Sequence, residues 1–297
     1  METCILCGGN RTEVIIVQGV DYEYGINFIS DVMRCIQCGL MWQYPIPKVE
    51  DLKEYYPADY ADYSVPSNQI TRFLLSIIEK LHAKKIQSLT GKKGKILDVG
   101  CAEGHTLEFL KKYGEWDMEG VEINVEAVQK AKEKGFKIYN GAFEEVDIPN
   151  EQFDLVRMNH LIEHVTNPMV MINKTYKILK PHGFLVIETP TIDCLDFKIF
   201  KRYWGALQLP RHIYFFNKKT LIQMLIENKF EVVHISFSLL TTGWALSIQN
   251  FIQSRKRYPL YKGRIKGYVI LLLLFFPVVL FQKLLNRSTI MSIVARK

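Results

Sequence analysis

Strand–helix alternation between residues 95 and 237 is the feature that most constrains the fold of this 297-residue chain. Short apolar runs with strand character alternate there with amphipathic helical segments, which predicts a mainly parallel sheet covered on both faces. The chain is therefore expected to be a doubly wound α/β protein. The expected strands are 95–100, 118–123, 136–139, 153–159, 184–188 and 230–237, and the expected helices are 106–112, 125–134, 168–179 and 218–228.

The turn after the first of these strands, in "ILDVGCAEGHTLEFL" (96–110), is the place where such a fold holds a ligand. Its glycines do not follow the GxGxxG spacing of a dinucleotide site, and the phosphate-cradling lysine of a P-loop is missing. The turn therefore suits a nucleoside ligand without phosphates. Glu122 ends the second strand, 22 residues after Gly100, and a carboxylate there can accept hydrogen bonds from both ribose hydroxyls.

Taken together, these segments resemble the class I S-adenosylmethionine-dependent methyltransferases. "ILDVGCAEG" is similar to the first motif of that family and "VEIN" to the acidic end of its second strand. The similarity continues through "FDLVRMNHLIEHVTNP" and "ILKPHGFLVIETP", and it covers roughly residues 93–238 plus "STIMSIVARK". It implies a Rossmann-like seven-stranded doubly wound sheet whose last strand is antiparallel, with S-adenosylmethionine as the methyl donor.

The resemblance also implies a set of cofactor-binding residues at the carboxyl ends of the strands. In the first turn they are Asp98, Gly100, Cys101, Ala102 and Gly104, of which Asp98 and the two glycines line the methionine end. At the ribose and adenine they are Glu122, Ile123, Ala142 and Phe143, although many relatives carry an acidic residue near the adenine edge. Asn159 and His160 close the site.

Methyl transfer is an in-line displacement, so the protein must align the acceptor and remove any proton that it carries. The candidate groups are His160, Glu163 and His164 in "HLIEH", and His212 in "LPRHIYFF". His160 is expected to be a base or an acceptor contact, or else to line the cleft. "HLIEH" is similar to a cation-binding segment of ubiquinone-pathway O-methyltransferases, so Glu163 and His164 are either metal ligands or a buried pair. His212 is either an active-site base or a packed loop histidine.

Four of the six cysteines form two CxxC pairs, each followed by glycine. Two such pairs can hold one tetrahedral Zn²⁺, which would supply much of the folding energy of so small a region. A redox dithiol or chance spacing is the alternative. With the tyrosine-rich segment that follows, the region is similar to the N-terminus of bacterial sugar C-methyltransferases. The predicted zinc ligands are Cys4, Cys7, Cys35 and Cys38. The predicted domains are a zinc ribbon in 1–45, a Tyr-rich linker and helix in 46–92, and the methyltransferase domain in 93–297.

The net charge of +7 is concentrated at the C-terminal end, because no Asp or Glu follows Glu231. There the segment "KGYVILLLLFFPVVLFQK" has no charge between Lys266 and Lys283. As a helix this uncharged segment would be about 24 Å long, which is shorter than a membrane crossing needs. If the last strand joins the sheet beside 230–237, the chain must return to the side it left. The insert 239–288 is therefore expected to be a helical hairpin that meets a membrane surface through 240–286. A dimerisation surface or an extra buried helix pair is the alternative.

We therefore expect a methyltransferase acting on a saccharide, a lipid-linked saccharide or an isoprenoid-type acceptor at the membrane surface. The alternative is a catalytically silent methyltransferase-like module that binds partners through its zinc ribbon. The N-terminus "METCILCGGN" has no secretory pattern, and thiols in CxxC pairs suit a reducing compartment. The expected location is cytoplasmic, peripheral or monotopic on the membrane, with no nucleic-acid partner because the N-terminal module carries few basic residues.

Overall fold

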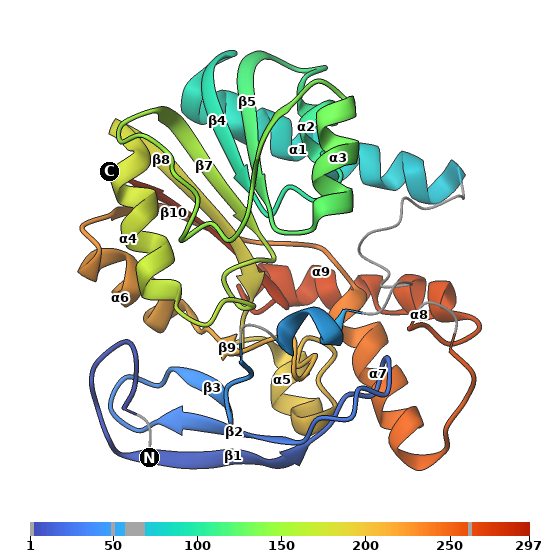
Figure 1. Cartoon of the computed structure of the whole chain (residues 1–297). Helices are drawn as coiled ribbons and strands as arrows, with labels where there is room; N and C mark the ends of the chain where they lie inside the picture. Colours follow the sequence, from blue (N-terminus) through green and yellow to red (C-terminus); the bar gives the residue numbers. More distant parts are fainter. Residues whose placement is uncertain (1–2, 49–50, 57–68, 261–262) are drawn as a thin grey trace.

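The computed structural model describes residues 3–48, 51–56, 69–260 and 263–297, and most of the expected tyrosine-rich linker lies outside these ranges. The described residues form two sheets, one of four strands in the order β1-β2-β3-β9 and one of seven in the order β10-β11-β8-β7-β4-β5-β6. In Figure 1 the small sheet lies at the bottom, the large sheet at the top, and the C-terminal helices on the right between them.

The large sheet confirms the Rossmann-like α/β prediction. Strand β11 runs antiparallel to both of its neighbours, β8 and β10, whereas β4, β5, β6, β7 and β8 pair in parallel. Predicted and observed strands agree closely, except that β8 is longer than its apolar run. The strands are β4 (Lys93–Val99), β5 (Glu115–Glu122), β6 (Lys137–Asn140), β7 (Phe153–Asn159), β8 (Leu179–Pro190), β10 (Glu231–Phe237) and β11 (Ile290–Arg296).

Helices cover both faces of this sheet, because neighbouring strand residues point to opposite sides. On β4, Ile96 packs in a cluster with α1, α2 and α3, whereas Leu97 packs in another with α4 and α6. Asparagine side chains cap α3, α4 and α6 by accepting a hydrogen bond from a backbone N–H of the first turn. The helices are α1 (Gln69–Thr90), α2 (His105–Leu110), α3 (Val125–Glu133), α4 (Pro168–Ile178) and α6 (Lys218–Glu227).

The small sheet carries the N-terminal cysteines and includes a strand from the methyltransferase region. Strands β1 (Thr12–Gly19), β2 (Ser30–Cys35) and β3 (Met41–Tyr44) are followed by a 3-10 helix, η1 (Asp51–Tyr55), and the fourth strand is β9 (Tyr214–Phe215). Met41 pairs with Phe215 and Trp42 with Tyr214. The predicted segment 1–45 therefore does not form its sheet alone, because β9 comes from residues beyond 93.

The C-terminal insert leaves and re-enters the large sheet at one edge. Phe237 at the end of β10 pairs with Met291, and the neighbouring Ile290 pairs with Pro190 at the end of β8. The insert therefore leaves and re-enters on one side of the sheet, as expected if the last strand lies beside β10, and that side is the carboxyl ends of the parallel strands. Its helices are α7 (Thr242–Arg255), α8 (Tyr268–Leu274) and α9 (Phe276–Leu284), and within the described ranges none combines the length and apolarity of a membrane span.

A buried polar cluster around Asp196 anchors the insert to α5 (Leu195–Phe200) and to β11. The Asp196 carboxylate accepts hydrogen bonds from Trp204 Nε1 at 2.9 Å, Thr289 Oγ1 at 2.8 Å and Gln282 Nε2 at 3.1 Å. Gln282, on α9, in turn accepts from Trp244 Nε1 of α7 at 2.8 Å. Helices α7 and α9 of the insert are thereby tied to one buried carboxylate.

Candidate active site

The turn between β4 and α2 lies at the carboxyl edge of the sheet, where backbone geometry requires glycine. The amides of Gly100 and Cys101 both donate to Val121 O of the neighbouring strand, at 2.9 and 3.1 Å. Gly100 has φ +77°, and a Cβ on it would lie 3.2 Å from Leu161 Cδ1. Gly104, with φ +73°, would place a Cβ 3.1 Å from Ala131. The first motif is therefore a tight backbone cradle, the arrangement that a nucleoside-type cofactor needs.

Glu122 ends β5 directly beside this cradle, and its buried carboxylate joins the turn after β4 to the turn after β5. Oε2 accepts a hydrogen bond from Ala102 N at 2.9 Å, and Oε1 accepts from Ile123 N and Asn124 N at the same distance. Among the described residues Oε2 therefore keeps one acceptor position. That position suits one ribose hydroxyl, and a second hydroxyl would have to displace a backbone N–H.

Two further predicted cofactor residues lie at the same carboxyl edge of the sheet. The side chain of Ile123 is 51% exposed at the carboxyl edge and offers an apolar surface to an adenine ring. Asn159 Oδ1, at the end of β7, is buried and has no hydrogen-bond partner among the described residues. A buried acceptor without a donor is rare in proteins, and a ligand amino or hydroxyl group would satisfy it.

The remaining predicted cofactor residues line or support the same edge. Ala142 begins a short turn after β6, and Phe143 is buried beneath it. Cys101 is buried, and a Cβ on Gly120 would lie only 2.4 Å from its Sγ, so the thiol fills space between turn and sheet. Asp98 is also buried and pairs with Arg157 Nη1 at 2.8 Å. Arg157 was not predicted as a site residue.

Beyond the cradle, Glu163, His164 and His212 converge from two segments 48 residues apart. Each offers one ligand atom, and the three atoms lie within 4.8 Å of one another. His212 Nδ1 lies 2.8 Å from Ala206 O and His164 Nδ1 lies 3.1 Å from Arg211 O. Because a carbonyl only accepts, both rings carry their proton on Nδ1 and present an Nε2 lone pair. Such a donor set fits a divalent cation.

Burial and mutual charge determine the protonation of this cluster. Burial alone would raise the pKa of Glu163, but hydrogen bonding to His160 and the charges of His164, His160 and His212 lower it to about 2. Burial lowers the pKa of His212 to about 3 and also lowers that of His164. At neutral pH the cluster is thus one carboxylate with two neutral imidazoles, which are weak bases and good metal ligands.

His160 is the accessible histidine of the group. Its backbone has φ +50° at the carboxyl end of β7, and its side chain is 39% exposed. Its Nδ1 lies 3.4 Å from Glu163 Oε1, while Glu163 Oε2 accepts from Thr189 Oγ1 at 2.9 Å. A carboxylate held in this way can orient the imidazole and leave its Nε2 directed to an acceptor.

The structure adds Tyr56 to this region. Its hydroxyl lies 2.9 Å from His164 Nδ1, and it comes from the segment just after η1. The sequence marked this stretch only as a Tyr-rich linker and did not single out Tyr56. Tyr56 is one of several tyrosines in this part of the sequence, and no local pattern distinguishes it from the others.

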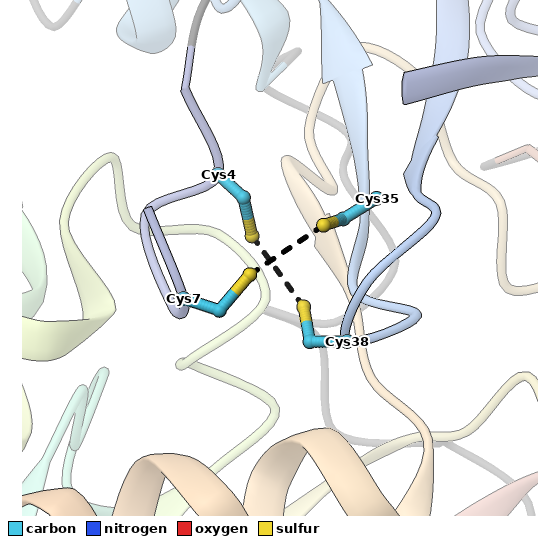
Figure 2. Close-up of side chains that lie close together, drawn as sticks. All are labelled: Cys4, Cys7, Cys35 and Cys38. Atoms are coloured by element: carbon cyan, nitrogen blue, oxygen red, sulfur yellow. Dashed lines mark hydrogen bonds between the residues drawn. The ribbon is translucent and has the colours of Figure 1, made fainter. Parts of the chain in front are cut away.

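The four N-terminal cysteines converge as predicted (Figure 2). Cys4 Sγ lies 3.5 Å from Cys38 Sγ, Cys7 Sγ lies 3.5 Å from Cys35 Sγ, and all four sulfurs are within 4.8 Å of one another. Gly8 N donates to Cys4 O and Gly39 N to Cys35 O, which closes each knuckle around its pair. Four thiolates at Zn–S distances of about 2.3 Å have this spacing, so the residues fit a tetrahedral zinc ion.

Comparisons of the sequence agree with the geometry. A family model described as a methyltransferase domain matches residues 68–235. A ubiquinone biosynthesis O-methyltransferase of Bradyrhizobium sp. (strain ORS 278) is 28% identical over 181 residues, which cover 56% of this chain and 70% of that protein. An uncharacterized protein of Methanocaldococcus jannaschii is 27% identical over 139 residues, covering 47% of this chain and 65% of that one. The chain thus spans between 49% and 70% of the length of these and the other curated relatives it matches.

Solved structures share the fold. Geranyl diphosphate C-methyltransferase from Streptomyces coelicolor superposes with a TM-score of 0.54 at 12% identity, over 83% of this chain and 97% of that one. A SAM-dependent methyltransferase from Archaeoglobus fulgidus superposes with a TM-score of 0.50 at 21% identity, over 74% and 93%. With a matching family model over more than half of its length and this sheet order, the chain belongs to the methyltransferase-domain family of class I S-adenosylmethionine-dependent methyltransferases.

Proposed function

We propose that this methyltransferase acts at a membrane surface and methylates a lipid-borne acceptor, a lipid-linked saccharide or an isoprenoid-type molecule. The observation that carries this proposal is the exposed apolar face of α8 and α9. Leu284 is 82% exposed and Ile270 69%. The other large apolar side chains exposed on these helices and at their end are Val269, Leu273, Leu274, Phe276, Leu280, Phe281 and Leu285.

The charges around this face favour an anionic bilayer over a second copy of the chain. Arg255, Lys256 and Arg257 end α7, while Lys266 and Lys283 flank the apolar helices, and no acidic residue follows Glu231. A soluble protein rarely exposes so many large apolar side chains on one short segment. Two copies meeting through this face would bring like charges together, whereas anionic headgroups would neutralise them.

Helix α7, whose Trp244 stacks on Phe275 between α8 and α9, lies near the proposed acceptor cluster. On α7, Ser247 Oγ accepts a hydrogen bond from Gly205 N at 2.8 Å. The next residue, Ala206, provides the carbonyl that holds His212. An acceptor whose tail rests on the insert therefore has its head group close to the cleft.

In the reaction, the S–CH₃ bond of the donor breaks as a bond from the methyl carbon to the acceptor forms, leaving S-adenosylhomocysteine. Glu122 and the glycine cradle hold the donor. His160 Nε2 takes the proton of an acceptor hydroxyl or amine, with Glu163 orienting the ring. Glu163, His164 and His212 would hold a divalent cation, which supplies positive charge beside an acceptor oxygen.

We also infer that Zn²⁺ bound by Cys4, Cys7, Cys35 and Cys38 has a structural role. All four ligands would be cysteines, which leaves no open coordination position for a substrate. The alternative of a catalytically silent module is disfavoured by the intact donor cradle and by the buried, unpaired Asn159 Oδ1.

Vesicle flotation tests the membrane proposal. We expect binding to vesicles of phosphatidylcholine and phosphatidylglycerol, and loss of that binding in the Leu273→Asp, Leu284→Asp double variant. One leucine side chain moved from water contributes about 1.5–3 kcal/mol, so affinity should fall at least about tenfold. Ile226→Asp on α6 is the matched control, since Ile226 is 60% exposed away from the insert. Equal flotation of all proteins, or dimerisation of the wild type that the double variant abolishes, would refute the proposal.

A further inference from the structure

Gln43, on β3 of the N-terminal module, is completely buried and hydrogen-bonds the chain on both sides of His212. Its backbone N–H donates to Ile213 O at 2.9 Å, and its side-chain Nε2 donates to Pro210 O at 2.7 Å. The other end of the amide, Oε1, lies 3.4 Å from Ser30 Oγ, which donates to it. One residue of the module therefore brackets a segment that is about 170 residues away in sequence.

The bracketed segment carries two of the contacts that orient the acceptor cluster. Between Pro210 and Ile213 lie the Arg211 carbonyl, which faces His164 Nδ1, and His212 itself. On the opposite side, Ile213 N donates to Glu163 O at 2.7 Å. The segment is thus held between β3 and the Glu163 turn, so a change at Gln43 acts directly on where both imidazoles point.

β9 contributes little rigidity of its own. It consists of two residues, Tyr214 and Phe215, and a ladder of that length is marginal without its neighbours. Strand β3 pairs with β9 through Met41 and Trp42, and Gln43 adds two hydrogen bonds to the residues just before β9, at Pro210 and Ile213. Because the amide of Gln43 is buried, removal of its Nε2 would leave the Pro210 carbonyl without this donor, in a place that water does not reach.

We propose that Gln43 is a positioning residue for the acceptor cluster, and that the cysteine module is a structural part of the active site rather than an appended partner-binding unit. This inference rests on the proposed function, which gives His212 and His164 their roles. Gln43 touches neither donor nor acceptor. It acts through the backbone of residues 210–213, and among the described residues its hydrogen bonds go to Pro210, Ile213 and Ser30 and not to the donor cradle.

The test uses Gln43→Met, which preserves the size of the side chain and removes the donor. Gln43→Asn, whose shorter amide does not reach Pro210 O, is the second variant. We expect amide hydrogen exchange at residues 211–213 to become about 5- to 100-fold faster, the range of a lost buried hydrogen bond, relative to core amides of β7. The proton resonance of His212 Nδ1–H should broaden or shift, and S-adenosylmethionine affinity should stay within about twofold of wild type. With an active acceptor, kcat should fall while the KM for the donor does not change.

Ser30→Ala is the matched control, because it removes only the long contact at the other end of the amide. It should leave the His212 signal and the exchange of 211–213 unchanged. The proposal is overturned if exchange at 211–213 rises only by the factor seen for the β7 core, or if His212 keeps its wild-type resonance in both Gln43 variants. These readouts need no acceptor, so failure to methylate any lipid would count against the proposed function without altering them.

Discussion

Replacing Asp196 with asparagine should destabilise the protein far more than an isosteric change normally does. All three partners of the carboxylate are donors: the indole N–H of Trp204, the hydroxyl of Thr289 and the amide N–H of Gln282. An asparagine has only one acceptor oxygen, so its NH₂ group must face at least one of these donors. Gln282 cannot simply turn over, because its Oε1 already accepts from Trp244.

The magnitude follows from these contacts. Losing a hydrogen bond to a charged acceptor costs about 1.5–3 kcal/mol, and leaving a buried donor unpaired costs about 1–3 kcal/mol more. The expected loss for Asp196→Asn is therefore about 2.5–6 kcal/mol of the free energy of unfolding. Since domains of this kind are stable by about 5–15 kcal/mol, the loss is a large share of the total.

Asp193→Asn is the matched control, three residues away. Asp193 Oδ2 accepts a single hydrogen bond, from the backbone N–H of Lys218 at 2.9 Å, and an asparagine oxygen can accept it equally well. We expect a change below about 1 kcal/mol there. Urea denaturation followed by circular dichroism measures both variants, and Trp204 and Trp244 fluorescence reports locally on the Asp196 cluster. If Asp196→Asn were within about 1 kcal/mol of Asp193→Asn, the cluster would not anchor the insert.

Three further predictions concern the donor site, the histidine cluster and the cysteines. Glu122→Ala should weaken S-adenosylmethionine binding at least about 10-fold by calorimetry, since it removes a charged acceptor. The control Glu126→Ala, at an exposed position, should leave the affinity unchanged. Equal affinities of the two variants would contradict the assignment of Glu122 to the donor site. The lowered His212 pKa, about 3 against 6.5, means that between these pH values the unfolded chain binds a proton that the folded chain does not. The free energy of unfolding should therefore fall as pH drops through this window, and His212→Gln should reduce the slope of that fall by up to about 1.4 kcal/mol per pH unit. Equal slopes in the variant and the wild type would refute this. Cys4→Ser should lower the zinc bound per chain in plasma mass spectrometry, whereas Cys101→Ala, outside the cluster, should leave it unchanged.

The donor half of the site could be predicted because its residues are consecutive in sequence. Asp98 to Gly104 form one turn, and Glu122 ends the next strand, so a local motif already places them together once the strands are parallel. Strand β7 appeared over its predicted residues for the same local reason. Strand β8 did not, because pairing with β7 and β11 on both sides extends it to Leu179–Pro190, beyond its own apolar run.

The acceptor half depended on tertiary structure. His212 meets His164 across 48 residues, Tyr56 reaches His164 across 108, and Gln43 reaches Pro210 across 167. None of these pairs has a periodicity or spacing that would mark it. The pairing of β9 with β3 places Gln43 beside Pro210, and backbone hydrogen bonds from Ile213 and Tyr214 to Glu163 O join the two histidine segments. A two-residue strand leaves no pattern of its own.

The sequence by itself determined the alternating architecture, because the periodicity of apolar residues distinguishes strands from helices. It also determined the cysteine pairs and the adenosine-type cradle, because their residues lie close together in the sequence. From the sequence, the return of the insert to the side it leaves was conditional on the last strand lying beside β10, and the structure supplied that pairing. Only the tertiary structure decided that the cysteine module completes its sheet with β9 and brackets His212. Contacts between segments so far apart depend on how separate layers pack, and no local run of residues records that.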